Sequence, residues 1–242
     1  YHALWQKEVH SRTRAWEKKQ RLMARYRASN AEGTQTDPGE LEAEFMKFNP
    51  KEELKIVNID GAWVLRVEVS TDIEDAAFLN NFREAIDRFW NNAEAMKDAH
   101  LTIALEWDHR KIADLYPEGP PTRGSSVNKN AHLARFGPKR LVLTTGAQTT
   151  HVWGARAIFV GSARTSRHTL AHEFAHLLGF TDRYLRAYER SPGDPNGVVL
   201  IEIIPYPNDI MAAPDRGKVK QRMVEALFAA YSTQPITAVS DQ

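Results

Sequence analysis

The clearest pattern in the chain is an alternation of apolar and polar residues over residues 55–70. The sequence KIVNIDGAWVLRVEVS places the turn signal Asp60-Gly61 between two such runs. This arrangement predicts a β-hairpin. Short apolar runs elsewhere predict further strands at residues 100–107, 140–146, 155–161 and 198–205.

Other segments carry apolar residues at helical spacing instead. The sequence predicts helices over residues 72–97, which begins with an aspartate N-cap candidate, 165–178 and 215–231. The chain therefore runs from strands through a long helix to more strands, a second helix, a loop and a last helix. This order predicts an α+β fold in which helices cover one sheet.

The first 50 residues differ in composition from the rest. Residues 2–30 have helical spacing, and residues 1–30 hold eight Lys or Arg against two Glu, a local charge of +6. The segment fits a solvated helix lying on the main domain, a pro-like or targeting segment, or a contact to an anionic partner. Residues 29–40 have the composition of a linker. We expect an N-terminal basic helix and linker over 1–50 and a main domain over 51–242.

A long stretch rich in Pro and Gly follows the strand expected at 100–107. Between residues 119 and 140 it carries five basic residues and no acidic one. Loops of this length inside a compact domain are often functional. An exposed surface excursion explains the composition equally well.

The composition narrows the class of protein. A chain of 242 residues with 42 % hydrophobic and 26 % charged residues suits one large globular domain or one domain with an appendage. A net charge of +1 gives no reason to expect a nucleic-acid partner. The lack of cysteine excludes disulfides and thiolate ligands. No apolar run approaches the roughly 20 residues of a membrane span. The start lacks the apolar segment of a signal peptide, so we expect a mature or trimmed form.

The stretch LAHEFAHLLGFTDRY, residues 170–184, carries the candidate chemistry. His172 and His176 stand four apart, so a helix brings both to one face, where two imidazoles can hold one zinc ion. Glu173 points away from them and can serve as a general base. Gly179 suits a left-handed C-cap, after which the chain can bring Asp182 to the ion as a third ligand.

Other residues compete for roles around this motif. Glu189 or Glu202 is an alternative third ligand. His168 lies one turn before His172 on nearly the same face and is either a cleft residue or plain surface. Tyr184 and His151 are candidates to stabilise an oxyanion, although both residue types are more often structural.

The motif H-E-x-x-H-x-x-G-x-x-D resembles that of the metzincin clan of zinc metallopeptidases. Most of the clan has His as the third ligand. Here Asp182 stands at that position, and the snapalysin-like enzymes also have Asp there. The segment Asn208-Asp209-Ile210-Met211 looks like the Met-turn of the clan. The resemblance covers roughly residues 55–231 and implies a metzincin-like zincin domain, with a mixed twisted sheet, an active-site helix and a C-terminal helix. It implies a Zn²⁺ ion held by His172, His176 and Asp182 above Met211.

The resemblance also implies an activity, a zinc-dependent endopeptidase in which Glu173 activates a zinc-bound water. The strand 155–160, with Ala157 and Phe159, would be the edge strand that pairs with substrate, and Ala213 and Tyr184 would line the site. The partner would be a protein or peptide substrate, and the location secreted or cell-envelope. Alternatives are a peptidase toxin or effector with one target, a hydrolase of another amide bond, and a non-catalytic binding module stabilised by zinc.

Overall fold

The computed structural model describes residues 3, 6, 17, 20–26, 43–122, 124–191, 193–194 and 197–232. The chain forms two compact units. The sheet unit comprises Phe48–Phe180 and Pro214–Gln242, and the hairpin unit comprises Tyr1–Lys47 and Thr181–Ala213. The N-terminal segment groups with a later part of the chain and does not form a unit by itself.

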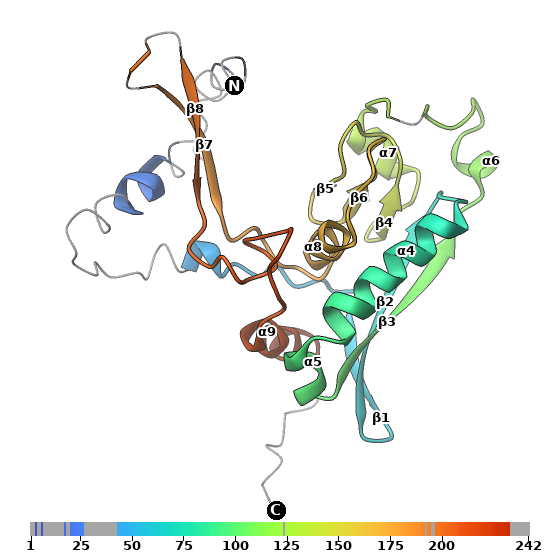
Figure 1. Cartoon of the computed structure of the whole chain (residues 1–242). Helices are drawn as coiled ribbons and strands as arrows, with labels where there is room; N and C mark the ends of the chain where they lie inside the picture. The colour runs from blue at the N-terminus through green and yellow to red at the C-terminus, as the bar shows by residue number, and fades with distance from the viewer. Residues whose placement is uncertain are drawn as a thin grey trace, which may run out of the picture. The chain divides into compact units, whose positions relative to one another are not determined.

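The sheet unit is built on one mixed sheet (Figure 1). Its strands are β1 (Lys55–Ile59), β2 (Ala62–Thr71), β3 (Leu101–His109), β4 (Leu141–Thr144), β5 (His151–Trp153) and β6 (Ala157–Phe159). The order is β1-β2-β4-β6-β5, with β3 paired to β2. Strands β2, β3, β4 and β6 are parallel, whereas β1 and β5 are antiparallel to their neighbours. The α+β class and the mixed sheet expected from the sequence are therefore confirmed.

The hairpin expected around Asp60-Gly61 is present between β1 and β2. Both turn residues have a positive φ, 51° for Asp60 and 87° for Gly61. This conformation suits the twist of a two-residue hairpin loop. The side chain of Asn58 closes the turn by accepting a hydrogen bond from Gly61 N at 3.1 Å.

The helix expected over residues 72–97 is divided into three parts. It contains α4 (Ala76–Ile86), the π-helical segment η1 (Asp87–Asn91) and α5 (Glu94–Asp98). Asp75 is the N-cap, since its side chain accepts a hydrogen bond from Phe78 N. The Asn91 amide is bonded to both N and O of Ile103 in β3, at 2.8 and 3.1 Å. These side-chain hydrogen bonds to the backbone of β3 compete with continuation of a regular helix at Asn91.

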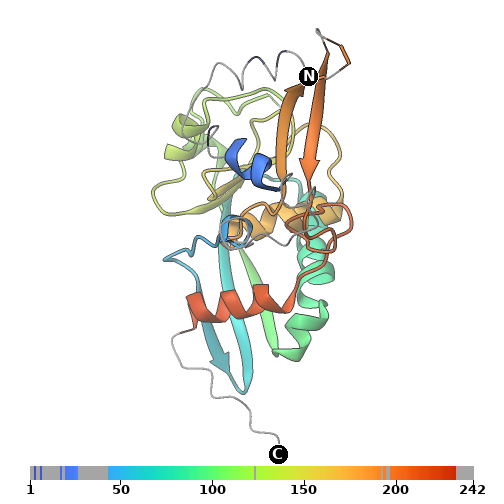
Figure 2. The ribbon, with the colours of Figure 1, turned by 90° about the vertical axis from the view of Figure 1, so that its left-hand side faces the viewer.

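Two helices lie side by side against the sheet, namely α4 and α8 (Arg167–Leu177) (Figures 1 and 2). Phe82 of α4 meets Phe174 of α8 edge to face, with ring centroids 6.1 Å apart. The last helix, α9 (Gln221–Tyr231), packs on β1 and α5, and its Phe228 meets Trp63 of β2. It starts six residues later than the sequence pattern suggests.

The stretch between β3 and β4 is anchored to the sheet by a few buried residues, although most of its described residues are exposed. It forms the short helices α6 (Ile112–Leu115) and α7 (Lys129–Ala134). Its apolar residues form a cluster with the sheet residues Val142, Ala157 and Phe159. Arg135, Lys139 and Arg140 are ion-paired, with Glu118, Glu52 and Glu68 respectively. Acidic residues therefore balance much of its charge, and two of the three, Glu52 and Glu68, lie outside the stretch.

The hairpin unit contains the antiparallel strands β7 (Leu185–Arg190) and β8 (Val198–Ile203). The sequence predicts β8, but β7 was expected to be irregular. Residues 20–26 are helical, and Met23 and Tyr26 form an apolar cluster with three hairpin residues, Leu185, Ile201 and Ile203. Most of the helix expected over residues 2–30 lies outside the described residues.

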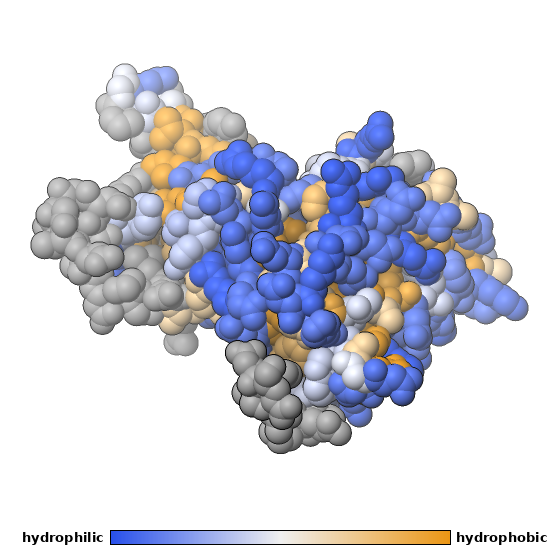
Figure 3. Space-filling model, turned by 60° about the horizontal axis from the view of Figure 1, so that its bottom comes forward, coloured by the Kyte–Doolittle hydropathy of each residue, from blue (hydrophilic) through white to orange (hydrophobic). Residues whose placement is uncertain are grey.

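Over the described residues, the surface exposes few large hydrophobic side chains. Ile59 and Trp153 are the clearest cases, at 42 % and 41 % exposure. The coloured surface in Figure 3 is mostly hydrophilic, with smaller hydrophobic areas between. No helix in the described part of the chain is long and apolar enough to cross a membrane.

Candidate metal centre

Helix α8 is held at both ends and along its apolar face. Ser166 is the N-cap and accepts a hydrogen bond from Thr169 N at 3.0 Å. The indole N–H of Trp90 donates to the carbonyl of Ala171 at 3.1 Å. The apolar residues Leu170, Phe174 and Leu177 are fully buried. The packing therefore fixes the rotation of the helix about its axis.

His172 and His176 occupy another side of the same helix. Their ring centroids are 5.0 Å apart and the rings are nearly perpendicular. His176 Nδ1 lies 2.8 Å from the carbonyl oxygen of Phe180. Because a carbonyl oxygen only accepts, this bond places the proton on Nδ1. It leaves the lone pair of Nε2 for a ligand, which is the usual arrangement of a metal-binding histidine.

Gly179 makes the turn that follows the helix. Its φ of 107° lies in the left-handed region, and Phe180 N bonds to Ala175 O at 3.1 Å while Gly179 N bonds to His176 O at 3.1 Å. These two bonds form a Schellman C-cap, so the predicted left-handed cap is confirmed. A Cβ at this position would lie 2.5 Å from the carbonyl oxygen of Asn49. Glycine is thus required both by conformation and by space.

The turn is followed at once by Asp182. His172, His176 and Asp182 each offer one ligand atom, and these atoms lie within 4.8 Å of one another. It is the sole group of three such side chains among the described residues. His172 is buried, His176 is half-buried and Asp182 is exposed. Two neutral imidazoles and one carboxylate suit zinc, and they suit ferrous iron as well.

Glu173 is placed beside this group by the helix itself. At 100° per residue it stands about 60° from His176 around the helix axis. It is half-buried. A carboxylate in this place is close to the ligand face without belonging to it, as a general base requires.

The segment expected to be a Met-turn is a tightly bonded turn within the hairpin unit. Asp209 Oδ1 accepts a hydrogen bond from Met211 N at 2.8 Å, and its carbonyl accepts from Ala212 N and Ala213 N at 3.0 and 2.9 Å. Met211 is fully buried. The backbone thus places Met211 at the centre of a closed turn.

Arg183, the residue after Asp182, is tied to this turn. Its guanidinium forms an ion pair with the Asp209 carboxylate, and both side chains are buried. Its backbone N donates to Met211 O at 2.9 Å. Sequence reasoning missed Arg183. Its position next to a candidate ligand was visible, but its partner in the NDIM segment was not.

The expected edge strand is wrong. Ala157 and Phe159 belong to β6, which pairs with β4 on one side and β5 on the other. Both residues are completely buried. Because both edges of β6 are occupied, a substrate strand cannot pair there. Among the described strands, β5 lies beyond β6 at one end of the sheet, and the sequence pattern did not reveal this strand.

The remaining candidates have ordinary structural contacts. Ala213 is buried, and the Tyr184 ring lies under the guanidinium of Arg186 at 5.4 Å. Glu202 is also bonded to Arg186, at 2.6 Å, whereas the side chain of Glu189 lies outside the described residues.

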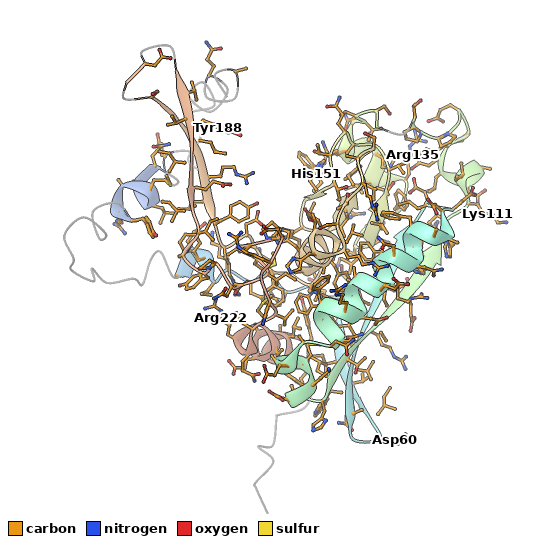
Figure 4. All side chains as sticks on the ribbon, in the orientation of Figure 1. Asp60, Lys111, Arg135, His151, Tyr188 and Arg222 are labelled. Atoms are coloured by element: carbon orange, nitrogen blue, oxygen red, sulfur yellow. The ribbon has the colours of Figure 1, made fainter. Side chains whose placement is uncertain are left out.

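The two other histidines named above are engaged as well. His168 Nδ1 lies 2.9 Å from Pro214 O, and the ring meets Phe89 at 4.4 Å. His151, on β5 (Figure 4), stacks on Phe159, and its Nδ1 lies 2.7 Å from Thr149 O.

Comparison with known proteins adds no information on the family or the function of the chain. No family model, no curated protein and no solved structure matches the chain.

Proposed function

We propose that this protein is a zinc-dependent endopeptidase. The observation that carries the proposal is the convergence of His172, His176 and Asp182, directly next to a carboxylate that does not belong to the group. A purely structural metal site has no use for that carboxylate. The C-cap at Gly179 and the Nδ1 bond of His176 support the proposal, because both prepare the ligand geometry.

His172, His176 and Asp182 would hold the ion. Bound there, zinc would supply a Lewis acid that polarises a carbonyl and acidifies water. Three protein ligands leave a position open for chemistry. The carboxylate lowers the charge of the occupied centre from +2 to +1, so we expect water to be less acidified than at a centre with three histidines.

Glu173 would move the proton. It takes one proton from the attacking water as the oxygen forms its bond to the peptide carbon. It then gives that proton to the amide nitrogen as the C–N bond breaks, so that the products are an amine and a carboxylic acid, and the acid releases the second water proton to solvent. The same residue acts first as base and then as acid.

Strand β5 would bind the substrate. It directly precedes β6 and the loop into α8, and its outer edge is unpaired among the described residues. An extended peptide can add to such an edge through main-chain hydrogen bonds. The exposed Trp153 lies on this strand and offers an apolar surface to the peptide.

The experiment is metal analysis combined with peptide-library cleavage. Wild type, Glu173→Gln, Asp182→Ala and the control Glu225→Gln, on an exposed position of α9, are analysed for zinc, iron and manganese. We expect about one zinc per wild-type chain and per Glu173→Gln chain, and much less in Asp182→Ala. Cleavage by Glu173→Gln should fall by about 10²- to 10⁴-fold, with Glu225→Gln unchanged.

Each other outcome selects an alternative. Zinc without cleavage of any peptide would favour either an effector with one protein target or a binding module stabilised by the metal. Cleavage of amides other than peptide bonds would favour a different hydrolase. Iron in place of zinc would point to oxygen chemistry, for which two histidines and one carboxylate are also suited. Equal activity of wild type and Glu173→Gln would overturn the proposal.

A further inference from the structure

A second buried polar cluster lies in the sheet unit, apart from the histidine pair. It consists of Asp72, Tyr116, His132 and Thr144, all at most 7 % exposed. Asp72 and Thr144 lie at the carboxyl ends of β2 and β4, whereas Tyr116 and His132 come from the stretch between β3 and β4. We name these four residues the Asp72 cluster.

The hydrogen bonds of the Asp72 cluster can be assigned proton by proton. Asp72 Oδ2 accepts from the Tyr116 hydroxyl at 2.6 Å and from the Thr144 hydroxyl at 2.9 Å. Each hydroxyl has one proton, and both are used here. His132 Nε2 lies 2.8 Å from Thr144 Oγ1 and 3.1 Å from the Tyr116 hydroxyl oxygen, so its N–H must be the donor shared by both contacts. Burial lowers the pKa of His132, which favours the neutral form of the ring.

This assignment leaves one carboxylate oxygen of Asp72 without a partner. Oδ1 is buried and accepts no hydrogen bond within the described structure. Both hydroxyl donors of the Asp72 cluster are directed to Oδ2. A buried carboxylate oxygen without a donor is costly, so its retention calls for an explanation.

Asp72 lines a pocket at the same end of the sheet. The pocket has a volume of about 280 Å³ and lies at the start of α4. It is also lined by the acids Glu74 and Asp75 and by the apolar residues Ile73, Phe78, Ile112, Pro120, Pro121 and Val160. No Lys or Arg is found among its described lining residues. Carboxyl ends of parallel strands are a usual position for ligand sites.

The acids in the pocket do not form a metal site. The histidine pair with Asp182 is the only convergent group of three possible ligands in the described part of the chain. A cation that fits here must therefore satisfy Asp72 with a hydrogen bond and also contact apolar walls. A volume at the lower end of ligand pockets favours a small group over a large molecule.

We propose that this pocket binds a primary ammonium group carried on an aliphatic stem. Because Oδ1 is buried, the Asp72 side chain would have to turn towards the pocket, where Oδ1 would accept a hydrogen bond from the ammonium. The stem would lie against Phe78, Ile112 and Val160. Glu74 and Asp75 would add long-range attraction at the rim. A lysine side chain of a peptide and a free alkylamine share this chemistry, and the experiment distinguishes them.

Calorimetric titration of the full-length chain tests the site. The probes are pentylamine, Nα-acetyl-lysine N-methylamide and the neutral control pentanol. We expect both amines to bind in the wild type and pentanol not to bind. Tighter binding of the acetylated lysine would identify a peptide side chain as the ligand, whereas tighter binding of pentylamine would identify a free amine.

Two sets of substitutions test the site and are chosen so that the protein still folds. Asp72→Asn retains an acceptor for the two hydroxyls but removes the charge, and we expect it to weaken amine binding by about tenfold or more. Glu74→Gln with Asp75→Asn changes exposed residues only, and asparagine still caps α4. We expect a smaller weakening from this pair.

Two results would overturn the inference. One is equal binding of pentylamine and pentanol, and the other is amine affinity unchanged in both the Asp72 variant and the rim variant. Neither result depends on metal or on cleavage, so failure here would leave the proposed peptidase untouched. Conversely, loss of cleavage in Glu173→Gln would not affect amine binding.

Discussion

Two buried polar groups, one in each unit, contrast in how their charge is compensated. In the hairpin unit Arg183 faces Asp209, so a cation and an anion balance each other. In the sheet unit Asp72 is surrounded by neutral donors, and one of its oxygens has none. Both groups join distant segments, since the first links residues 26 positions apart and the second 72.

The two groups therefore differ in role. The Arg183–Asp209 ion pair is structural, whereas the Asp72 carboxylate is suited to binding a cation. In a balanced pair each charge already faces its counter-ion, and the effect of the pair is to fix the segment that carries Asp182 to the turn that carries Met211. An unbalanced carboxylate is complete only with a cation, so it can contribute binding energy. The following predictions test this contrast from the largest expected effect to the smallest.

The largest effect should come from Asp209→Ala. This change leaves the buried Arg183 charge without its carboxylate, so we expect the free energy of unfolding to fall by about 3–5 kcal/mol. Urea denaturation followed by circular dichroism measures the loss. We also expect weaker zinc binding, because Arg183 adjoins Asp182 in the chain.

A double exchange provides the control for that variant. Arg183→Met with Asp209→Leu removes both charges and should recover much of the lost stability. If the double variant were as unstable as Asp209→Ala, the contribution would lie in the hydrogen bonds of the turn and not in the balance of charge.

A smaller loss is expected from Tyr116→Phe, which removes a donor to a carboxylate. Hydrogen bonds to charged groups contribute about 1.5–3 kcal/mol. The control is Tyr231→Phe, since the Tyr231 hydroxyl has only neutral partners: it donates to the Leu178 carbonyl and accepts from Lys51 N. Each of these bonds should contribute about 0.5–1.5 kcal/mol. Denaturation of both variants compares them. Equal losses would argue that the carboxylate acceptor makes the Tyr116 bond no stronger than a bond to a neutral partner.

The third prediction concerns pH. Burial lowers the pKa of His132 below its ordinary 6.5, so the unfolded chain binds this proton more readily than the folded protein. The free energy of unfolding should therefore decrease as the pH falls from about 6.5 towards the lower folded pKa. His132→Gln should flatten this part of the stability curve. Denaturation between pH 5 and 8, with chelator present, measures it, and an unchanged slope would contradict the assigned neutral form.

The smallest effect is expected at an exposed ion pair. Arg140 and Glu68 are paired on the surface, with side chains 45 % and 55 % exposed. Glu68→Gln should change the free energy of unfolding by less than about 1 kcal/mol, because water screens both charges. A loss as large as that of Tyr116→Phe would remove the distinction between buried and exposed polar groups.

The sequence determined the local features of this protein. The Asp60-Gly61 hairpin, the helix around His172 and His176 and the left-handed cap at Gly179 follow from turn chemistry, helical periodicity and the special freedom of glycine. Each depends on residues fewer than about ten positions apart. Such local interactions do not depend on how distant segments of the chain pack.

Only the tertiary structure decided which distant residues meet. The pairing of Arg183 with Asp209, the position of β5 at the end of the sheet and the convergence of Asp72, Tyr116, His132 and Thr144 join segments far apart in sequence. Periodicity marks β6 as a strand but not as an interior one, because strand order is set by packing and crossover connections. For the same reason no sequence pattern shows that one oxygen of Asp72 is left without a donor.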